Sequence, residues 1–274
     1  MDAGTKVTTV TTENSKDLPQ HFFKKSHELV FSQLGLSSRE HDLFALFLSR
    51  LHKDHWKDYL AGKSINAPRY EFETEVLKEW FGLSSKQLYP TLRPVAERLS
   101  TKTVGLVNND DQSFDFISLF SRIQYKNGRL TIVPNVELIS AYVDYSQGHA
   151  QIDHRVFRRL KNEYAKRLYT FFSRFKDEKT ILHPQSIEKL HAMMGLLDSD
   201  GKLTSKSYNQ NKFFLERCIR RPLHEMMSCD ILKEELSILV DEETGNFGFK
   251  PIKKGKKIIA LKFLFSWKDN KNEF

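Results

Sequence analysis

The chain has 274 residues, of which 39% are hydrophobic and 28% charged, a balance typical of folded proteins rather than disordered ones. No apolar run approaches the roughly 20 residues of a membrane-spanning helix, and the polar stretch 1–17 lacks the apolar core of a signal peptide. Two cysteines without metal-site spacing predict neither a disulfide framework nor a metal centre, and they favour a reducing, cytoplasmic location. The length allows one large domain or two of ordinary size.

The excess of positive over negative charge lies entirely in the second half of the chain. Residues 1–146 carry 18 basic and 18 acidic side chains, whereas residues 147–274 carry 25 basic and 17 acidic ones. The whole net charge of +8 therefore belongs to the second half. A basic region beside a neutral one predicts a polyanionic partner for the basic part, most often nucleic acid, with a generic solubilising surface as the alternative.

The first clear helix begins after Ser37, which can cap it while Glu40 completes a capping box. Its apolar stripe at helical spacing consists of Leu43, Phe44, Phe47, Leu48 and Leu51. A short extended piece around Tyr70 and Phe72 follows after a loop. The chain therefore opens with a helix and a short strand.

Two more helices are expected in the first half. Residues 73–81 form one, which Gly82 ends, and residues 84–99 form the expected first recognition helix. Pro90 and Pro94 fit poorly inside a helix because proline lacks an N–H and crowds the preceding turn. We therefore expect this helix to be kinked or to start late.

Extended segments close the first half. Residues 101–107 and 114–125 are expected as strands. The dipeptide Asn127-Gly128 is a strong two-residue hairpin turn, and residues 130–133 supply the return strand. The first half thus ends in a β-hairpin.

The second half repeats this plan up to its second helix. One long helix is expected over residues 153–176, followed by a short strand over residues 180–182. A helix then begins after Pro184 and ends at Gly195, which suits a C-cap. The same order of helix, strand and helix has now occurred twice.

An amphipathic helix over residues 208–227 follows, and strands over residues 231–241 and 256–267 close the chain. Helix, short strand, helix, helix and β-hairpin is the element order of a winged helix. The order occurs twice, about 120 residues apart, although the two halves are too different for a repeat in the residues themselves.

The fold class expected from this order is α+β, with two tandem winged-helix domains. A flexible tail is expected over residues 1–20. The first domain would span residues 21–146 and serve dimerisation and secondary DNA contact. The second would span residues 147–274 and make the main DNA contacts.

Helix 208–227 has the features of a recognition helix for the major groove: an apolar stripe, a basic opposite face and a polar start. Asn209 and Gln210 near its start can pair with base edges, while an ordinary amphipathic surface helix is the alternative. The side chains expected to reach guanine or phosphates are Lys212, Arg217, Arg220 and Arg221.

Further cations are candidates for phosphate contacts, with solvated surface charges as the alternative. A lysine-rich segment between the last two strands is expected at the tip of a wing, and it carries Lys253, Lys254, Lys256 and Lys257. A candidate phosphate clamp at the start of helix 153–176 consists of Arg155, Arg158 and Arg159. Secondary contacts in the first half are expected from Lys86, Arg93 and Lys126.

The sequence lacks the residue motifs that the enzymatic functions considered for such a protein would need. A rolling-circle nickase needs a metal-binding His-x-His pair, which the ten histidines do not contain. No phosphate loop of the form GxxxxGK followed by Ser or Thr is present. We therefore expect no catalytic residue, no metal and no cofactor.

Four stretches follow one another in a characteristic order along the chain: Leu36–Leu43, Leu160–Tyr169, Ile219–Glu225 and Lys253–Ile258. Together they resemble the RepE/RepB-type plasmid replication initiators, which bind iterons, the short direct repeats of an origin. The second stretch, which is similar to the opening of that family's second winged helix, is the most specific. The resemblance covers roughly residues 22–267.

This resemblance implies a monomer that binds iterons in double-stranded DNA to start replication, in equilibrium with a homodimer that represses its own gene. It also implies host replication machinery, such as a helicase, as a partner, and main base contacts from the second domain. Pro90 and Pro94 depart from the family pattern in the first recognition helix. The alternative function is a winged-helix transcription regulator without a replication role.

Overall fold

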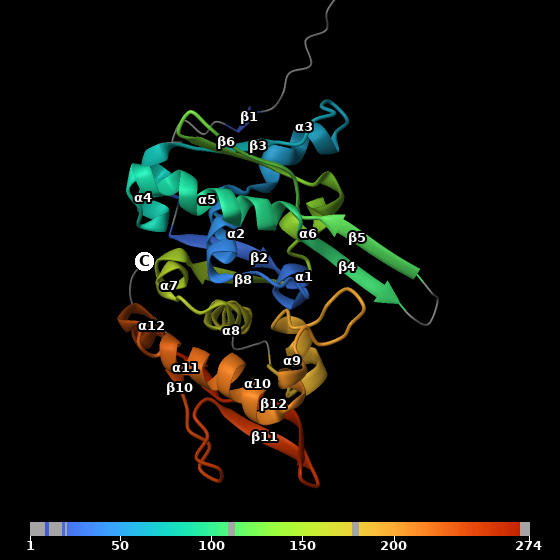
Figure 1. Cartoon of the computed structure of the whole chain (residues 1–274), viewed down its shortest axis with the longest axis vertical. Helices are drawn as coiled ribbons and strands as arrows, with labels where there is room; N and C mark the ends of the chain where they lie inside the picture. Colours follow the sequence, from blue (N-terminus) through green and yellow to red (C-terminus); the bar gives the residue numbers. More distant parts are fainter. Residues whose placement is uncertain (1–8, 11–17, 20, 109–112, 177–180, 269–274) are drawn as a thin grey trace, which may run out of the picture.

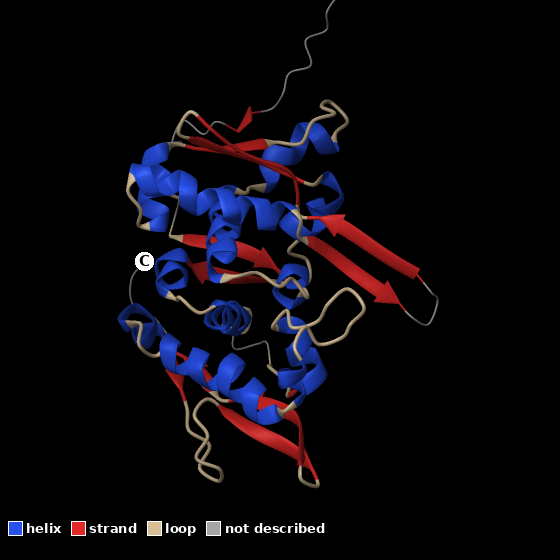
Figure 2. Cartoon of the chain, viewed as in Figure 1, coloured by secondary structure: helices blue, strands red, loops and turns tan. Residues whose placement is uncertain are grey.

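The computed structural model describes residues 9–10, 18–19, 21–108, 113–176 and 181–268. Most of the expected tail over residues 1–20 lies outside these ranges, but Thr9–Val10 form strand β1, which runs parallel to β3. Figure 2 shows sheets at both ends and in the middle of the longest axis, with helices between them.

The first half contains the expected helices and short strand. Helix α2 (Ser38–Arg50) has the capping box, in which the Ser37 N–H donates to Glu40 Oε2 at 2.9 Å. The buried residues of α2 include the predicted stripe up to Leu48. The elements that follow are η1 (Lys53–Trp56), α3 (Lys57–Leu60), β3 (Arg69–Phe72) and α4 (Thr74–Phe81). Gly82 ends α4 with φ of 63°, a left-handed conformation that favours glycine.

Helix α5 (Ser85–Ser100) begins directly after Ser84, the expected cap, so the prediction of a late start is wrong. Ser84 and Gln87 form a capping box that fixes this start. Pro90 and Pro94 both lie on the exposed face. The carbonyls that lose their N–H partner there face water, which can hydrate them, so the helix continues through both prolines.

The strand expected over residues 114–125 is two strands. β5 (Ser113–Ser118) pairs with β4 (Thr103–Asn108) in a separate ribbon, which Figure 1 shows projecting from the body of the molecule. β6 (Phe120–Lys126) pairs instead with β7 (Arg129–Pro134) through the predicted turn, where Asn127 and Gly128 have φ of 52° and 74°. Leu119 lies between β5 and β6, and its N–H donates to the Lys102 carbonyl. One hairpin ends before this residue and the other begins after it.

The two halves are joined by a shared sheet and a shared core. β2 (Phe22–Ser26) pairs antiparallel with β8 (His149–Asp153). Helices α1 (His27–Phe31) and α6 (Ile139–Val143) lie beside this pair, and η2 (Val136–Leu138) leads into α6. Buried apolar residues of both halves belong to one continuous cluster. The predicted boundary between residues 146 and 147 therefore falls where the two halves pack closely together. The division into two domains at this point stays a prediction.

The prediction of a single helix over residues 153–176 is wrong. Two helices occur instead, α7 (His154–Arg159) and α8 (Glu163–Ser173). Asn162 accepts a hydrogen bond from the Tyr164 N–H at 2.8 Å and so caps α8. An Asn at this position favours a helix start, which interrupts the long apolar stripe without disturbing its burial.

The next expected strand is displaced. Thr180 lies outside the described residues, and Ile181 and Leu182 are not in a strand. The short strand is β9 (Gln185–Ser186), which leads directly into α9 (Ile187–Met193). Gly195 follows α9 with φ of 64°, as expected for a glycine after a helix end.

The helix expected over residues 208–227 is composite. It consists of a 3-10 turn η3 (Lys206–Asn209), α10 (Asn211–Phe214), the π-helical segment η4 (Leu215–Arg220) and α11 (Arg221–Met226). The Arg221 N–H donates to the Glu216 carbonyl, five residues earlier. Pro222 has no N–H to continue the usual α-helical ladder, which explains the wider turn just before it.

The prediction of a strand over residues 231–241 is largely wrong. Asp230–Glu235 form helix α12, because this segment is rich in good helix formers and buries Leu232. β10 (Leu236–Ile238) pairs with β13 (Phe265–Trp267). The wing is the hairpin of β11 (Phe249–Lys254) and β12 (Lys257–Phe263), so the last expected strand is also divided.

The same strand order occurs in both halves. In the first, β3 pairs with β7 and β7 with β6; in the second, β9 pairs with β12 and β12 with β11. In each case the short strand after the first helix joins the second strand of the closing hairpin. The winged-helix element order expected from the sequence is thus present at both ends of the chain.

One pH effect on stability follows from this core. Burial lowers the pKa of His41 well below its usual range, and the nearby cations Arg167, Lys25 and Lys166 act in the same direction. Below pH of about 6.5 the unfolded chain binds a proton at this residue that the folded chain refuses. The contribution of His41 to the free energy of unfolding is therefore expected to fall on acidification, by up to about 1.4 kcal/mol per pH unit.

Urea titrations between about pH 7 and pH 5 measure this slope. The His41→Leu variant removes this titrating group and should reduce the slope. The same slope in the wild type and His41→Leu would contradict the assignment.

Candidate nucleic-acid interface

The composite helix from α10 to α11 separates apolar and basic side chains as a recognition helix requires. Phe214, Cys218, Ile219, Leu223 and Met226 are fully buried. The predicted contacts Lys212, Arg217 and Arg221 are exposed. Two of these three have partners on the helix itself, because Arg217 lies over the Phe213 ring and Arg221 pairs with Glu216. These contacts leave the guanidinium groups at the surface.

The start of this helix is polar and exposed. Asn209 and Gln210 are exposed, as a role at base edges requires. The neighbouring Asn211 is different, because its side chain donates to the Ile258 carbonyl of β12 at 3.1 Å. This bond ties the helix start to the wing, so the two elements form one surface.

Arg220 lies at the flank of the helix, between it and the wing. Its Nη2 donates to Asn246 Oδ1 at 3.0 Å, and its guanidinium lies 5.5 Å from the centre of the Phe249 ring. Neither contact was predicted from the sequence. The residues are separated by more than twenty positions, and no periodic pattern links them.

The wing carries the predicted lysines at its end. Lys253, Lys254, Lys256 and Lys257 are all exposed, and Gly255 turns the hairpin with φ of 61°. Figure 1 shows β11 and β12 at the lower end of the molecule, adjoining the composite helix. The side chains can therefore follow a phosphate backbone while the helix occupies a groove.

The arginine cluster of α7 is mostly engaged within the protein. Arg155 forms a close ion pair with Asp153, with Nη2 and Oδ2 separated by 2.6 Å. Arg158 donates to the carbonyls of Glu79 and Trp80 in α4. Arg159 alone of the three is exposed. A phosphate clamp by all three arginines stays a prediction, and the structure gives two of them other partners.

The first half has a weaker basic surface. Lys86 and Arg93 are exposed on α5, and Lys126 is exposed at the end of β6. Sequence reasoning missed an aromatic pair nearby, in which Tyr89 of α5 is 55% exposed and its ring lies 6.3 Å from that of Tyr125. The signal was available, since Tyr89 falls outside the buried stripe of its helix.

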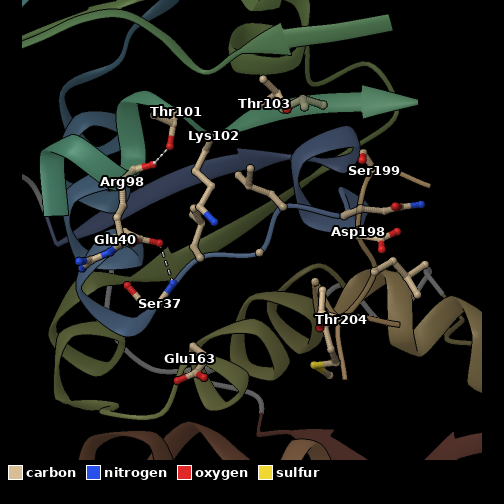
Figure 3. A pocket seen from close by; sticks show the side chains of 18 of the residues that line it. Ser37, Glu40, Arg98, Thr101, Lys102, Thr103, Glu163, Asp198, Ser199 and Thr204 are labelled. Atoms are coloured by element: carbon tan, nitrogen blue, oxygen red, sulfur yellow. Dashed lines mark hydrogen bonds and ion pairs between the residues drawn. The ribbon is translucent and has the colours of Figure 1, made fainter. Parts of the chain in front are cut away.

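A cavity of about 660 Å³ lies between the two halves. Figure 3 shows Glu40 facing Arg98 and the Ser37 N–H inside it. These hydrogen bonds cap α2 and join it to α5. These three polar groups of the cavity thus have structural partners. Elsewhere in the described ranges, no group of three or more His, Cys, Asp or Glu side chains could hold a metal ion.

None of the described helices combines the length and apolar character needed to cross a membrane. A search of curated proteins finds no match. Among solved structures, the chain resembles the Pi initiator protein, whose crystal structure is a complex with iteron DNA. The TM-score is 0.61 at 16% sequence identity, and the match covers 93% of this chain and all of the other. At this identity the likeness shows a shared fold.

A family model described as the WH1 region of the initiator replication protein matches residues 22–173. The matched region runs from β2 to the end of α8. It covers more than half of the 274 residues. The chain therefore belongs to the initiator replication protein family.

Proposed function

We propose that this protein starts replication of a plasmid or similar replicon by binding directly repeated origin sequences in double-stranded DNA. One observation carries the proposal: an exposed, lysine-rich wing is bonded to the start of a helix with exposed amide and basic side chains. Membership of the initiator family and a fold shared with a protein crystallised on iteron DNA support it.

Each element has its own role in this proposal. The composite helix enters the major groove, where Asn209, Gln210, Lys212 and Arg217 meet base edges or nearby phosphates. The wing lysines contact phosphates, which adds affinity without reading sequence. Residues 147–274 make the main contacts, and α5 with Lys86, Arg93 and Lys126 adds secondary ones.

The proposal also includes partners. A monomer binds the origin repeat, a homodimer formed through residues 21–146 represses the protein's own gene, and host replication proteins are recruited at the origin. The protein would act in the cytoplasm, associated with its replicon. No catalytic step is assigned to the chain, because its site is a binding surface.

A transcription regulator is the alternative function, since the winged-helix surface would serve it equally well. The two functions differ in the arrangement of target sites. Direct repeats of about two helical turns beside the gene favour an initiator, whereas a single inverted repeat at a promoter favours a regulator. The gene's flanking DNA is thus the most informative probe.

A footprint with a stoichiometry measurement tests the proposed mode of binding. Figure 1 shows α5 and the composite helix at different heights along the longest axis, with α2, α7 and α8 between them. If both enter the duplex, one chain should protect about two turns, or about 20 base pairs, with the stronger protection under the second half.

Binding should require no dimer. Analytical ultracentrifugation on a duplex with one repeat is expected to give one chain per duplex. Two chains per repeat, or protection limited to one turn, would contradict the tandem mode of binding.

A further inference from the structure

A hairpin that precedes the wing packs against the recognition helix. Residues 239–248 form this pre-wing hairpin, closed by the bridge between Val240 and Phe247. The Phe247 ring stacks on His224 of α11, with centroids 5.0 Å apart and planes at 15°. Gly248 approaches so closely that an added Cβ would lie 2.7 Å from a methyl group of Leu223. The hairpin is therefore fixed to the helix.

Within the pre-wing hairpin, three side chains form a relay of hydrogen bonds that ends at the helix. The carboxylate of Asp241, a residue only 6% exposed, accepts from the Thr244 hydroxyl. A carboxylate has no proton to give, so Thr244 must donate its only proton there. The Thr244 oxygen then accepts from Asn246 Nδ2 at 2.7 Å. The relay thereby sets the direction in which the Asn246 amide faces.

This orientation turns the amide oxygen of Asn246 towards Arg220. Asn246 Oδ1 accepts from Arg220 Nη2 at 3.0 Å, while the Phe249 ring, which is fully buried, supports the guanidinium. Asn246 occupies one N–H group of Arg220, and the described part of the chain gives the others no hydrogen-bond partner. The guanidinium is partly exposed, held in place and still able to donate.

We propose that the pre-wing hairpin is a positioning element for base recognition, in which the relay of Asp241, Thr244 and Asn246 holds Arg220 ready to donate to a base edge. The inference rests on the proposed function. An arginine loses much rotamer freedom when it binds, and a guanidinium already fixed by the protein loses less. Thr244 and Asn246 act through Arg220, so they affect the preference at the base position that Arg220 reads.

The experiment uses the full chain and a library of randomised duplexes. The wild type first selects its preferred sequence, and the variants are then compared on single-base changes of that sequence. Arg220→Ala is expected to reduce discrimination at one position by about tenfold. Thr244→Val, which removes the hydroxyl but keeps the shape, should reduce it at the same position by about threefold. Thr244→Ser should retain it.

Two controls separate positioning from general weakening. Glu242→Gln changes an exposed charge in the same hairpin and should leave every base preference unchanged. The double variant Arg220→Ala/Thr244→Val should lose no more discrimination than Arg220→Ala, because the hydroxyl acts through the guanidinium. Asn246→Ala tests the same relay independently if Thr244→Val proves unstable in thermal unfolding.

The outcomes distinguish this inference from the proposed function. Sequence selection by the wild type, with unchanged discrimination in both Thr244→Val and Asn246→Ala, would overturn the positioning role and leave the proposed function standing. A uniform loss at all positions would also overturn it. Failure of the wild type to select any sequence would refute the proposed function, and the inference with it.

Discussion

Replacing Lys253, Lys254, Lys256 and Lys257 together with glutamine is expected to weaken duplex DNA binding about a thousandfold near 0.15 M salt. All four side chains are exposed near the end of one hairpin, where they can follow a phosphate backbone. Each phosphate contact adds about 0.9 to the steepness of log affinity against log salt concentration. The variant should therefore show a slope shallower by about 3.6, measured by fluorescence anisotropy over a salt series.

The control for this effect lies in the first half. Lys53, Lys57 and Lys63 are exposed around η1 and α3, and their replacement by glutamine should change the slope little. The wing variant should also keep its relative preference among sequences, because phosphates carry no base information. An altered sequence preference in the wing variant would reverse the assigned roles of helix and wing.

The Lys166→Ala variant is expected to lose about 3–5 kcal/mol of unfolding free energy. The Lys166 side chain is fully buried in α8, and its ammonium forms an ion pair with Asp42 of α2. Burial lowers the pKa of Lys166, although the Asp42 carboxylate opposes this shift. Removal of the ammonium leaves the buried carboxylate with the longer contact to partly exposed Arg39, whose Nη1 lies 3.7 Å from Asp42 Oδ2. Loss of the close charge partner costs far more than the pair contributes.

Urea denaturation measures this loss, and a double variant supplies the control. Asp42→Leu/Lys166→Met replaces both charges with apolar groups and should recover most of the stability. The exposed pair of Lys202 and Asp200 offers a second comparison, in which Lys202→Ala should have little effect. A double variant less stable than Lys166→Ala would show that the ion pair itself stabilises the contact between the halves.

Local signals in the sequence determined much of the fold. The capping box of Ser37 and Glu40, the glycine after α4 and the Asn127-Gly128 turn all occur where the sequence predicted them. These signals succeed because each depends on backbone groups within a few residues. Helix boundaries failed where two signals competed, as at Asn162, whose capping preference interrupted an otherwise continuous apolar stripe.

The candidate site likewise combines features that the sequence predicted with contacts that only the structure shows. Charge asymmetry predicted the basic half, and the lysine-rich segment predicted exposed lysines at a hairpin end. The first strand of the wing was placed wrongly, at residues 231–241 instead of β11, because strand pairing depends on distant residues. The sequence could not reveal that Arg158 binds α4, or that Asn246 holds Arg220. These contacts join residues that are far apart along the chain. Only tertiary packing decides which arginines remain free for DNA, since every buried carbonyl or amide oxygen competes for the same guanidinium groups.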